Sequence, residues 1–492
     1  MTESDYLAKV LVELVGNPIH VYSLMDRLVM QLPVLRKELE EHLGTDNTTE
    51  SIRTLVEEIE MPEEMDLEGV TQALARIQFA YRLDPVELSG GKIKDTQTEG
   101  RLSVKQMMNI ADRRISGAQP MRPAIGKEYA LAIEWAEGAL TMANEVGDKP
   151  MEKVITRFLH KARLEHNNNW NSPVGQRGNY PNEEFFLKRI ESSSPLLTSG
   201  KELRKEETDF LREESGNGHL KQGYNIHDFY SLCRGETVIH SHAPRLPMCH
   251  LTTKNNPYFF LAPLKLEILS EEPLLHLYHD ILTDGEINFM TSRILSKLQA
   301  ASVQDTSVSN GGGSKVSNER TQSSGWIWDQ EDDLLYKLSK KTGKFAEMVT
   351  TRPKEEMAPG VDWRFVESEP WQMGLYGPGG HYLPHFDAFE PNLMPPDVWS
   401  TNGLWVGSRI ATVMFYLSDL VGGRTAFPKM GLAATPRKGT AVFWYNLHKN
   451  GNRDDLSLHG ACPTALGIKW VSNKWIREGE QIWKMPCAGD DS

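Results

Sequence analysis

A histidine and an aspartate two positions apart, His385 and Asp387, are the residues of this sequence best suited to bind a metal ion together. They follow a glycine- and proline-rich turn at residues 377–380 and lie in an extended run. On a strand, residues i and i+2 point to the same face, so an imidazole nitrogen and a carboxylate can be directed at one point. With a second histidine they would form the 2-His-1-carboxylate facial triad, which holds Fe(II) and leaves coordination positions open. His459 is the candidate for that third ligand.

The sequence around these residues indicates a β-rich domain. This context is needed as evidence, because a His-x-Asp on its own is weak evidence for a metal site. Strands are predicted at residues 413–417, 439–445 and 469–475, with a turn and a short strand at 422–428. The segments YGPGGHYLPHFD, RIATVMFYLSD, GGRTAFP, KGTAVFWYNL and KWVSNKW resemble, in order and spacing, those of the iron- and 2-oxoglutarate-dependent dioxygenases. The chain most closely resembles the catalytic (alpha) subunit of collagen-type prolyl 4-hydroxylase, strongly over its C-terminal half and more loosely over its N-terminal half.

This resemblance implies which residues bind the co-substrate and the peptide. The far carboxylate of 2-oxoglutarate would meet a buried cation, Lys469, which lies in an apolar strand; related hydroxylases outside the collagen-type branch use arginine there. Further residues implied near the co-substrate are Tyr376, Thr412, Tyr416 and Trp475, and those implied to face the peptide are Tyr382, Arg409 and Trp444. L-Ascorbate would keep the iron reduced. At Leu375 and Arg477 the family often has asparagine and histidine, and these departures bear on peptide preference more than on iron binding.

Composition and charge exclude some classes of partner. The 492 residues are 39% hydrophobic and 25% charged, which is ordinary for a soluble protein. A net charge of −13 and a pI near 5.7 argue against nucleic acid as a partner. No stretch approaches the ~20 consecutive apolar residues of a membrane span.

The four cysteines bear on the cellular compartment. From the residues alone they could be buried thiols, and no Cys-x-x-Cys suggests zinc. The resemblance implies two intrachain disulfides, Cys233–Cys249 and Cys462–Cys487, and therefore an oxidising compartment, the lumen of the endoplasmic reticulum. One glycosylation sequon, at Asn47, fits that compartment but also arises by chance.

The two ends of the chain carry no targeting signal. Residues 1–6 lack a basic n-region, whereas family members begin with a signal peptide, so we expect an incomplete or variant start. Residues 489–492 do not form a Lys-Asp-Glu-Leu-type retention signal. In the family, protein disulfide isomerase provides retention and solubility in a tetramer of two catalytic subunits and two isomerase subunits, and the resemblance implies that partner here.

The predicted fold class is α+β and multidomain. An all-α N-terminal region with tetratricopeptide-like helix pairs precedes a C-terminal double-stranded β-helix, or jelly roll, flanked by helices. The predicted domains are a dimerisation-like helical domain at 1–95, a peptide-substrate-binding domain at 96–190, a linker and covering segment at 191–263, and a catalytic domain at 264–492 with its core at about 368–478.

Several helices are predicted within these domains. An apolar stripe from Val21 to Leu39 is either the core of its own domain or a dimerisation helix. Helix pairs are predicted over 101–165, with the second pair interrupted after Glu165 by an asparagine-rich run. A helix over 284–300 with Asp284 as its N-cap and another over 332–342 are predicted to flank the strands.

Three functions fit these observations. The first is a procollagen-type prolyl 4-hydroxylase subunit that acts on proline in X-Pro-Gly sequences. The second is a hydroxylase of another Pro-rich secreted protein. The third is a non-catalytic module that binds Pro-rich peptides, and the presence of all three candidate ligands together with Lys469 counts against it.

Overall fold

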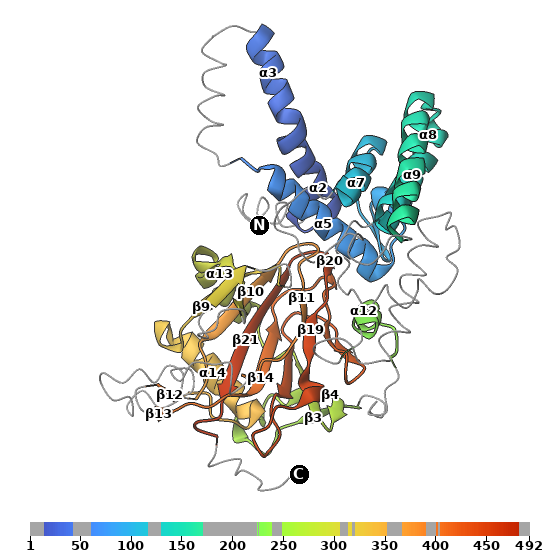
Figure 1. Cartoon of the computed structure of the whole chain (residues 1–492). Helices are drawn as coiled ribbons and strands as arrows, with labels where there is room; N and C mark the ends of the chain where they lie inside the picture. Colours follow the sequence, from blue (N-terminus) through green and yellow to red (C-terminus); the bar gives the residue numbers. More distant parts are fainter. Residues whose placement is uncertain are drawn as a thin grey trace. The chain divides into compact units, whose positions relative to one another are not determined.

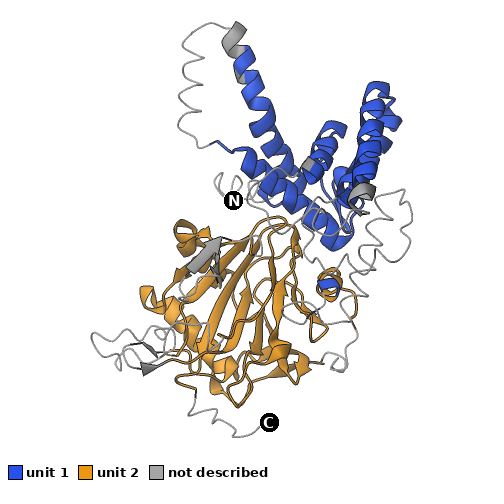
Figure 2. Cartoon of the chain, viewed as in Figure 1, with its two compact units in different colours: residues 1–227 blue, residues 228–492 orange. Residues whose placement is uncertain are grey.

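The computed structural model describes residues 14–42, 61–116, 129–170, 224, 226–238, 248–305, 313–316, 320–351, 367–389, 400–401 and 404–481. The chain divides into two compact units, residues 1–227 and 228–492 (Figure 2). The Asn47 sequon and Cys487 lie outside the described residues. Among the helices that are described, none combines the length and apolar character needed to cross a membrane.

The N-terminal unit is helical (Figure 1). At the start of α2 the Asn17 side chain accepts hydrogen bonds from the backbone N–H groups of Ile19 and His20, and Pro18 occupies the first turn. Helices α7 and α8 pack against each other, as do α8 and α9, and a small hairpin follows α6. The bounds are α2 Pro18–Asp26, η1 Arg27–Gln31, α3 Leu32–His42, α5 Glu64–Tyr81, α6 Pro85–Ser89, β1 Lys92–Ile93, β2 Thr96–Gln97, α7 Val104–Ser116, α8 Tyr129–Val146 and α9 Lys149–Trp170.

Members of the predicted apolar stripe are exposed in this unit. Leu24 and Leu35 are 50% and 53% exposed, whereas Ile19 and Tyr22, which lie on α2 but do not belong to the stripe, are fully buried. Within the described residues the stripe is therefore not the internal core that one of the two predictions required. The predicted interruption after Glu165 is wrong in position, because α9 continues to Trp170.

The C-terminal unit is built on two main antiparallel sheets, an arrangement consistent with a jelly roll, and its described residues also form the two-stranded sheets β7-β8, β12-β13 and β15-β20. The larger, nine-stranded sheet has the order β3-β4-β5-β18-β14-β21-β10-β9-β6, and the smaller has the order β11-β19-β16-β17. The large-sheet bounds are β3 Met248–Thr252, β4 Leu264–Glu271, β5 Leu274–His279, β6 Gln299–Ala300, β9 Ser323–Ile327, β10 Trp371–Tyr376, β14 Arg409–Tyr416, β18 Ala441–Tyr445 and β21 Lys469–Arg477. Those of the small sheet are β11 Tyr382–His385, β16 Thr425–Phe427, β17 Leu432–Ala434 and β19 His459–Ala461.

Shorter elements complete this unit. They are α12 Ile226–Arg234, η2 Pro257–Phe259, α13 Asp284–Ile294, η3 Leu295–Lys297, β7 Ser302–Asp305, β8 Gly313–Val316, η4 Asp329–Glu331, α14 Asp333–Ala346, β12 Ser400–Thr401, β13 Leu404–Trp405, β15 Val421–Gly422, β20 Thr464–Leu466 and η6 Asp455–Ser457. The N-cap of α13 is Thr283 and not the predicted Asp284, because the Thr283 hydroxyl accepts from the Glu286 N–H in a capping box. The predicted helix was also too long, since α13 ends at Ile294.

The centre of the large sheet is buried on both faces, which explains the continuous apolar run at residues 413–416 of its central strand β14. Val413 and Phe415 belong to the core that includes residues of α13 and α14, whereas Met414 and Tyr416 belong to the core shared with the small sheet. Successive residues of a strand point to opposite faces, so residues 413–416 are apolar at every position. Figure 1 shows α13 and α14 beside this sheet. The same alternation decides which residues of β21 can face the space between the sheets.

The cysteines are paired differently from the prediction. Cys233, in α12, forms a disulfide with Cys462, which follows β19, so neither of these two has the predicted local partner. Cys249 is exposed on β3, an edge strand of the large sheet. The reason is the packing of α12 against β19, which is so close that a Cβ on Gly460 would lie 2.9 Å from a ring carbon of Phe229. This packing brings Cys233 to Cys462, whereas the family resemblance had implied Cys249 as its partner.

Candidate active site

The three candidate metal ligands meet because two short strands of the small sheet pair in one register. His385 at the end of β11 lies directly opposite His459 at the start of β19. Opposite residues of an antiparallel pair have Cβ atoms roughly 5 Å apart, so this register alone brings the two imidazoles together. Asp387 lies in the bend just beyond β11, not within the predicted strand. One ligand atom from each of the three side chains lies within 4.8 Å of the others.

Backbone carbonyls fix both imidazole rings. His385 Nδ1 lies 2.8 Å from the carbonyl oxygen of Leu383, and His459 Nδ1 lies 2.9 Å from that of Ser457. A carbonyl oxygen can only accept, so each Nδ1 carries the proton and donates. Each Nε2 is then the unprotonated nitrogen, and metal-binding histidines are commonly oriented in this way.

The carboxylate of Asp387 is held ionised and oriented. Thr412 Oγ1 and Trp475 Nε1 donate to its Oδ2 over 2.7 and 2.8 Å. Burial by itself would raise the pKa of Asp387, but His459, His385, Arg409 and the Trp475 hydrogen bond outweigh it and lower the pKa to about 2. Burial, followed by the nearby His459, lowers the pKa of His385 to about 3. A neutral imidazole and an ionised carboxylate are the forms that bind a metal ion.

Lys469 presents a buried cation without a counter-ion. Its side chain begins β21 and is 1% exposed, and among the described residues no group accepts a hydrogen bond from Nζ. The nearest aromatic ring centroids, those of Tyr376 and Tyr416, lie 5.3 and 5.7 Å from Nζ. Burial lowers the pKa of this ammonium to about 7. An unpaired polar group in such a place costs free energy, so an anionic group of a ligand fits here.

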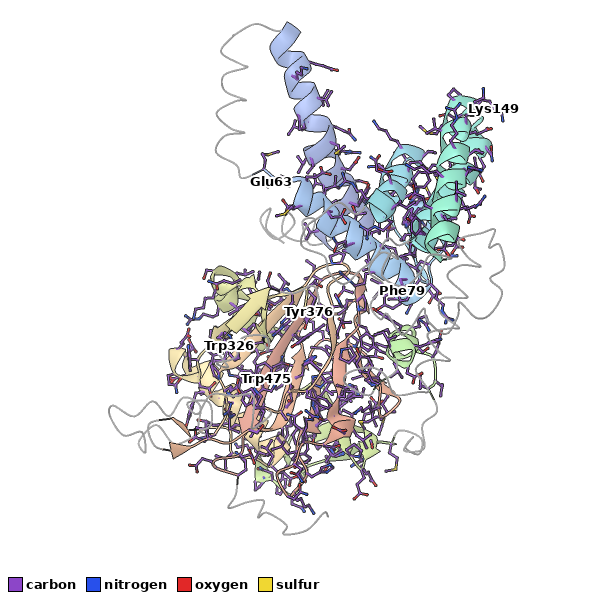
Figure 3. The ribbon with its side chains drawn as sticks, viewed as in Figure 1. Glu63, Phe79, Lys149, Trp326, Tyr376 and Trp475 are labelled. Carbon is purple, nitrogen blue, oxygen red and sulfur yellow. A yellow bond between two sulfur atoms is a disulfide. The ribbon has the colours of Figure 1, made fainter. Side chains whose placement is uncertain are left out.

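A single cavity connects Lys469 to the three candidate ligands. Of the other predicted residues, Tyr376, Trp475, Tyr382, Arg409 and Trp444 also line it. Tyr376, Trp326 and Trp475, labelled in Figure 3, come from strands β10, β9 and β21 of the large sheet. The rings of Trp326 and Trp475 lie 5.7 Å apart.

Two of the residues predicted near the co-substrate are buried next to the cavity and do not line it. Thr412 is fully buried and donates to Asp387, and Tyr416 donates to Thr425 Oγ1 over 2.7 Å. Thr425 lines the cavity in place of Tyr416. Both residues lie next to side chains that line the cavity, and their role near the co-substrate stays a prediction.

The lining residues that were not predicted include three polar ones, Arg320, Gln372 and Asn473. The guanidinium of Arg320 lies 4.8 Å from the ring centroid of Tyr382, and Asn473 Nδ2 donates to Gln372 Oε1 over 2.9 Å. Asn473 could have been found in the sequence, because it shares one strand face with Lys469 in a period of two. The sequence around Arg320 and Gln372 carries no comparable signal.

Arg477, where the family often has histidine, is connected to the cavity by a buried cluster of charged side chains. Glu369 accepts two hydrogen bonds from Arg409, over 2.6 and 2.7 Å, and one from Arg477 over 3.0 Å. Arg409 also stacks on Trp475, with its guanidinium carbon 3.6 Å from the ring centroid. Arg477 therefore influences the orientation of Arg409 without lining the cavity itself.

Comparison with known proteins identifies the two parts of the chain. A family described as "Prolyl 4-Hydroxylase alpha-subunit, N-terminal region" matches residues 2–95, and the "2OG-Fe(II) oxygenase superfamily" matches residues 371–477. The second match covers β10, β21 and all three candidate ligands. It confirms the prediction that the C-terminal unit is an Fe(II)- and 2-oxoglutarate-dependent oxygenase.

Whole-chain relatives agree with both matches. Prolyl 4-hydroxylase subunit alpha-2 of Caenorhabditis elegans is 30% identical over 97% of this chain and 83% of its own length. Prolyl 4-hydroxylase subunit alpha-1 of Rattus norvegicus is 29% identical over 96% of this chain and 85% of its own length, and that of Homo sapiens is 28% identical over the same shares. The chain therefore belongs to the family of prolyl 4-hydroxylase alpha subunits.

Proposed function

We propose that this chain hydroxylates proline in X-Pro-Gly-type sequences of collagen-like peptides, using O2 and 2-oxoglutarate and releasing succinate and CO2. The observation that carries the proposal is the single cavity shared by a 2-His-1-carboxylate set and a buried, unpaired lysine. The first can hold Fe(II), and the second can bind the far carboxylate of a 2-oxo acid. A purely peptide-binding module would have no use for either feature.

Each part of the cavity has a proposed role. His385, Asp387 and His459 would hold Fe(II), and the Lys469 ammonium would bind the far carboxylate of 2-oxoglutarate. The Tyr376 hydroxyl is a further donor to that carboxylate. Bound Fe(II) and 2-oxoglutarate supply the oxidising chemistry, and the protein supplies position and charge. L-Ascorbate would keep the iron reduced.

Trp475 contributes to the site in two ways. Its indole lines the cavity, and its N–H donates to the Asp387 carboxylate and helps to fix its orientation.

The peptide is proposed to lie over the aromatic side of the cavity. Tyr382, Trp444 and the Arg409 guanidinium line it there, and aromatic faces suit a proline ring. Tyr382 also stacks on the candidate ligand His385, with ring centroids 3.6 Å apart. A peptide ring placed on Tyr382 would therefore be held next to the metal site.

The N-terminal unit is proposed to bind a second part of the substrate. Residues 96–190 would form the peptide-substrate-binding domain, with α7, α8 and α9 as tetratricopeptide-like helix pairs, after a dimerisation-like domain at 1–95. The packing of α8 against α7 and α9 supports the helix pairs, and the family match over residues 2–95 supports the first of the two domains. A Pro-rich chain is already stiff, so it loses little entropy when such helices bind it.

A panel of Pro-rich peptides tests the proposal. We expect peptides with Pro-Pro-Gly repeats to stimulate 2-oxoglutarate decarboxylation and to gain 4-hydroxyproline, whereas polyproline and Pro-rich sequences without Pro-Gly do so less. Stimulation only by sequences without Pro-Gly would instead support a hydroxylase of another secreted protein. Peptide binding without any decarboxylation, in the presence of Fe(II) and ascorbate, would support the non-catalytic alternative.

The proposed partner is protein disulfide isomerase, in a tetramer of two subunits of each kind in the endoplasmic reticulum lumen. The relatives are named as subunits, and exposed apolar residues on α2 and α3 offer a surface for the contact between alpha subunits. We expect this chain, expressed alone behind a signal peptide, to aggregate or to be inactive, and co-expression with the isomerase to give a soluble, active complex. Light scattering that shows an active monomer without the isomerase would contradict this.

A further inference from the structure

Asn446, a fully buried residue directly after β18, touches neither the cavity nor any candidate ligand, yet both of its side-chain hydrogen bonds lead toward the site. Trp444 Nε1 donates to Asn446 Oδ1 over 2.9 Å. Asn446 Nδ2 donates to Thr412 Oγ1 over 2.9 Å. The Asn446 backbone is fixed as well, because its N–H donates to the Ile410 carbonyl over 2.8 Å.

The chemistry of the partners fixes the direction of this chain of hydrogen bonds. An indole N–H can only donate, so the amide oxygen of Asn446 must face Trp444 and its NH2 group must face Thr412. The Thr412 oxygen then accepts from the amide, which leaves its own proton for Asp387 Oδ2 at 2.7 Å. An ionised carboxylate can only accept, so each hydrogen bond from Trp444 through Asn446 and Thr412 to Asp387 has one donor and one acceptor.

A second branch runs from Asn446 to another candidate ligand. The indole that Asn446 holds packs edge-on against the ring of His459, with centroids 4.7 Å apart and planes at 62°. Strand register supports both branches, because Thr412 lies opposite Trp444 on β18 and opposite Trp475 on β21. The amide therefore sits where one side chain can control two ligands at once.

We propose that Asn446 is a positioning residue that holds two of the three iron ligands, Asp387 through Thr412 and His459 through Trp444. This inference rests on the proposed function, which assigns those ligands. Hydrogen bonds behind metal ligands orient them, and their loss typically weakens metal affinity by about 10–100-fold. Asn446 thus shapes the metal site although it contacts neither the metal nor the peptide.

Binding of Co(II) alone to the metal-free protein, followed by absorption and calorimetry, tests the proposal without turnover. Asn446→Leu keeps the volume and removes both hydrogen bonds, and we expect it to weaken Co(II) binding by about 10–100-fold. The matched control is Gln481→Met, because Gln481 is also a buried amide with two hydrogen bonds, to the Val349 backbone, and it does not line the cavity. We expect that control to lose stability but to keep its Co(II) affinity.

A double-mutant cycle tests the route through Thr412. Thr412→Val should weaken Co(II) binding and Thr412→Ser, which keeps the hydroxyl, should not. In the Thr412→Val background Asn446→Leu should cost less affinity than in the wild type, because the two residues share one path to Asp387. If Asn446→Leu fails to fold, the comparison of Thr412→Val with Thr412→Ser still tests whether the Thr412 hydroxyl supports Asp387.

Two results would overturn the proposal: an Asn446→Leu variant that binds Co(II) as well as Gln481→Met does, or a Thr412→Val variant with wild-type affinity. An absence of peptide hydroxylation in the wild type would refute the proposed function without altering either of these measurements.

Discussion

Replacing His459 with alanine is expected to abolish iron-dependent turnover, because the change removes one of three ligands that no other described side chain at the cavity can replace. His385→Ala and Asp387→Ala should have the same effect. The Asp387 change also leaves the hydroxyl of Thr412 and the indole N–H of Trp475 without their buried acceptor. The measurement is Fe(II)-dependent 2-oxoglutarate decarboxylation at saturating peptide, with metal content determined on the same samples.

His381→Ala is the matched control for these variants. His381 lies four residues before His385 and is also buried, but its Nδ1 is paired with Thr321 Oγ1 at 2.8 Å and it does not line the cavity. We expect this variant to keep most of its activity and its iron. Full activity of His459→Ala, or complete loss in His381→Ala with normal folding, would mean that the ligands are assigned wrongly.

The second large effect is expected at Lys469. Lys469→Ala removes the cation that would pair with a buried carboxylate, and breaking such a pair costs about 3–5 kcal/mol. The KM for 2-oxoglutarate should therefore rise by roughly a hundred- to a few-thousand-fold, at 1.4 kcal/mol per factor of ten. Lys469→Arg should rescue only part of this, because the guanidinium is larger and rigid. An unchanged KM in the alanine variant would show that another cation binds the co-substrate.

The same lysine should make co-substrate affinity depend on pH. Burial lowers the pKa of Lys469 to about 7 in the free protein, so above pH 7 the side chain is increasingly neutral. An anionic carboxylate needs the ammonium form, and binding must then take up a proton. Affinity should be constant below pH 7 and fall as pH rises above it, by up to about tenfold per pH unit. Calorimetric titration should show this slope in the wild type and its loss in Lys469→Arg, whose guanidinium stays charged.

Residue spacing and the family resemblance each contributed to predicting the centre of the site. The i, i+2 spacing nominated His385 and Asp387 as metal ligands, the resemblance and the apolar strand nominated Lys469, and all three line one cavity with His459. Likewise, the uninterrupted apolar run at residues 413–417 marked a strand buried on both faces. Such local patterns are readable because backbone geometry fixes which side of a strand each residue takes.

Long-range pairing could not be predicted in the same way. The meeting of His385 with His459 depends on the register between β11 and β19, and the bond between Cys233 and Cys462 depends on the packing of α12. Neither leaves a periodic trace in the sequence. Asn446 was missed for a related reason, because a buried amide at the end of a strand has the same sequence signature as one in an ordinary turn.

The measurement that tests the central claim most directly is the stoichiometry of the reaction on a Pro-Pro-Gly repeat peptide. Wild-type protein, with its proposed isomerase partner, Fe(II), O2 and ascorbate, should form succinate and 4-hydroxyproline one for one. Both products should disappear in His459→Ala and should require far more 2-oxoglutarate in Lys469→Ala. Succinate formed without any hydroxyproline on every peptide tested, or hydroxyproline formed by His459→Ala, would contradict the account.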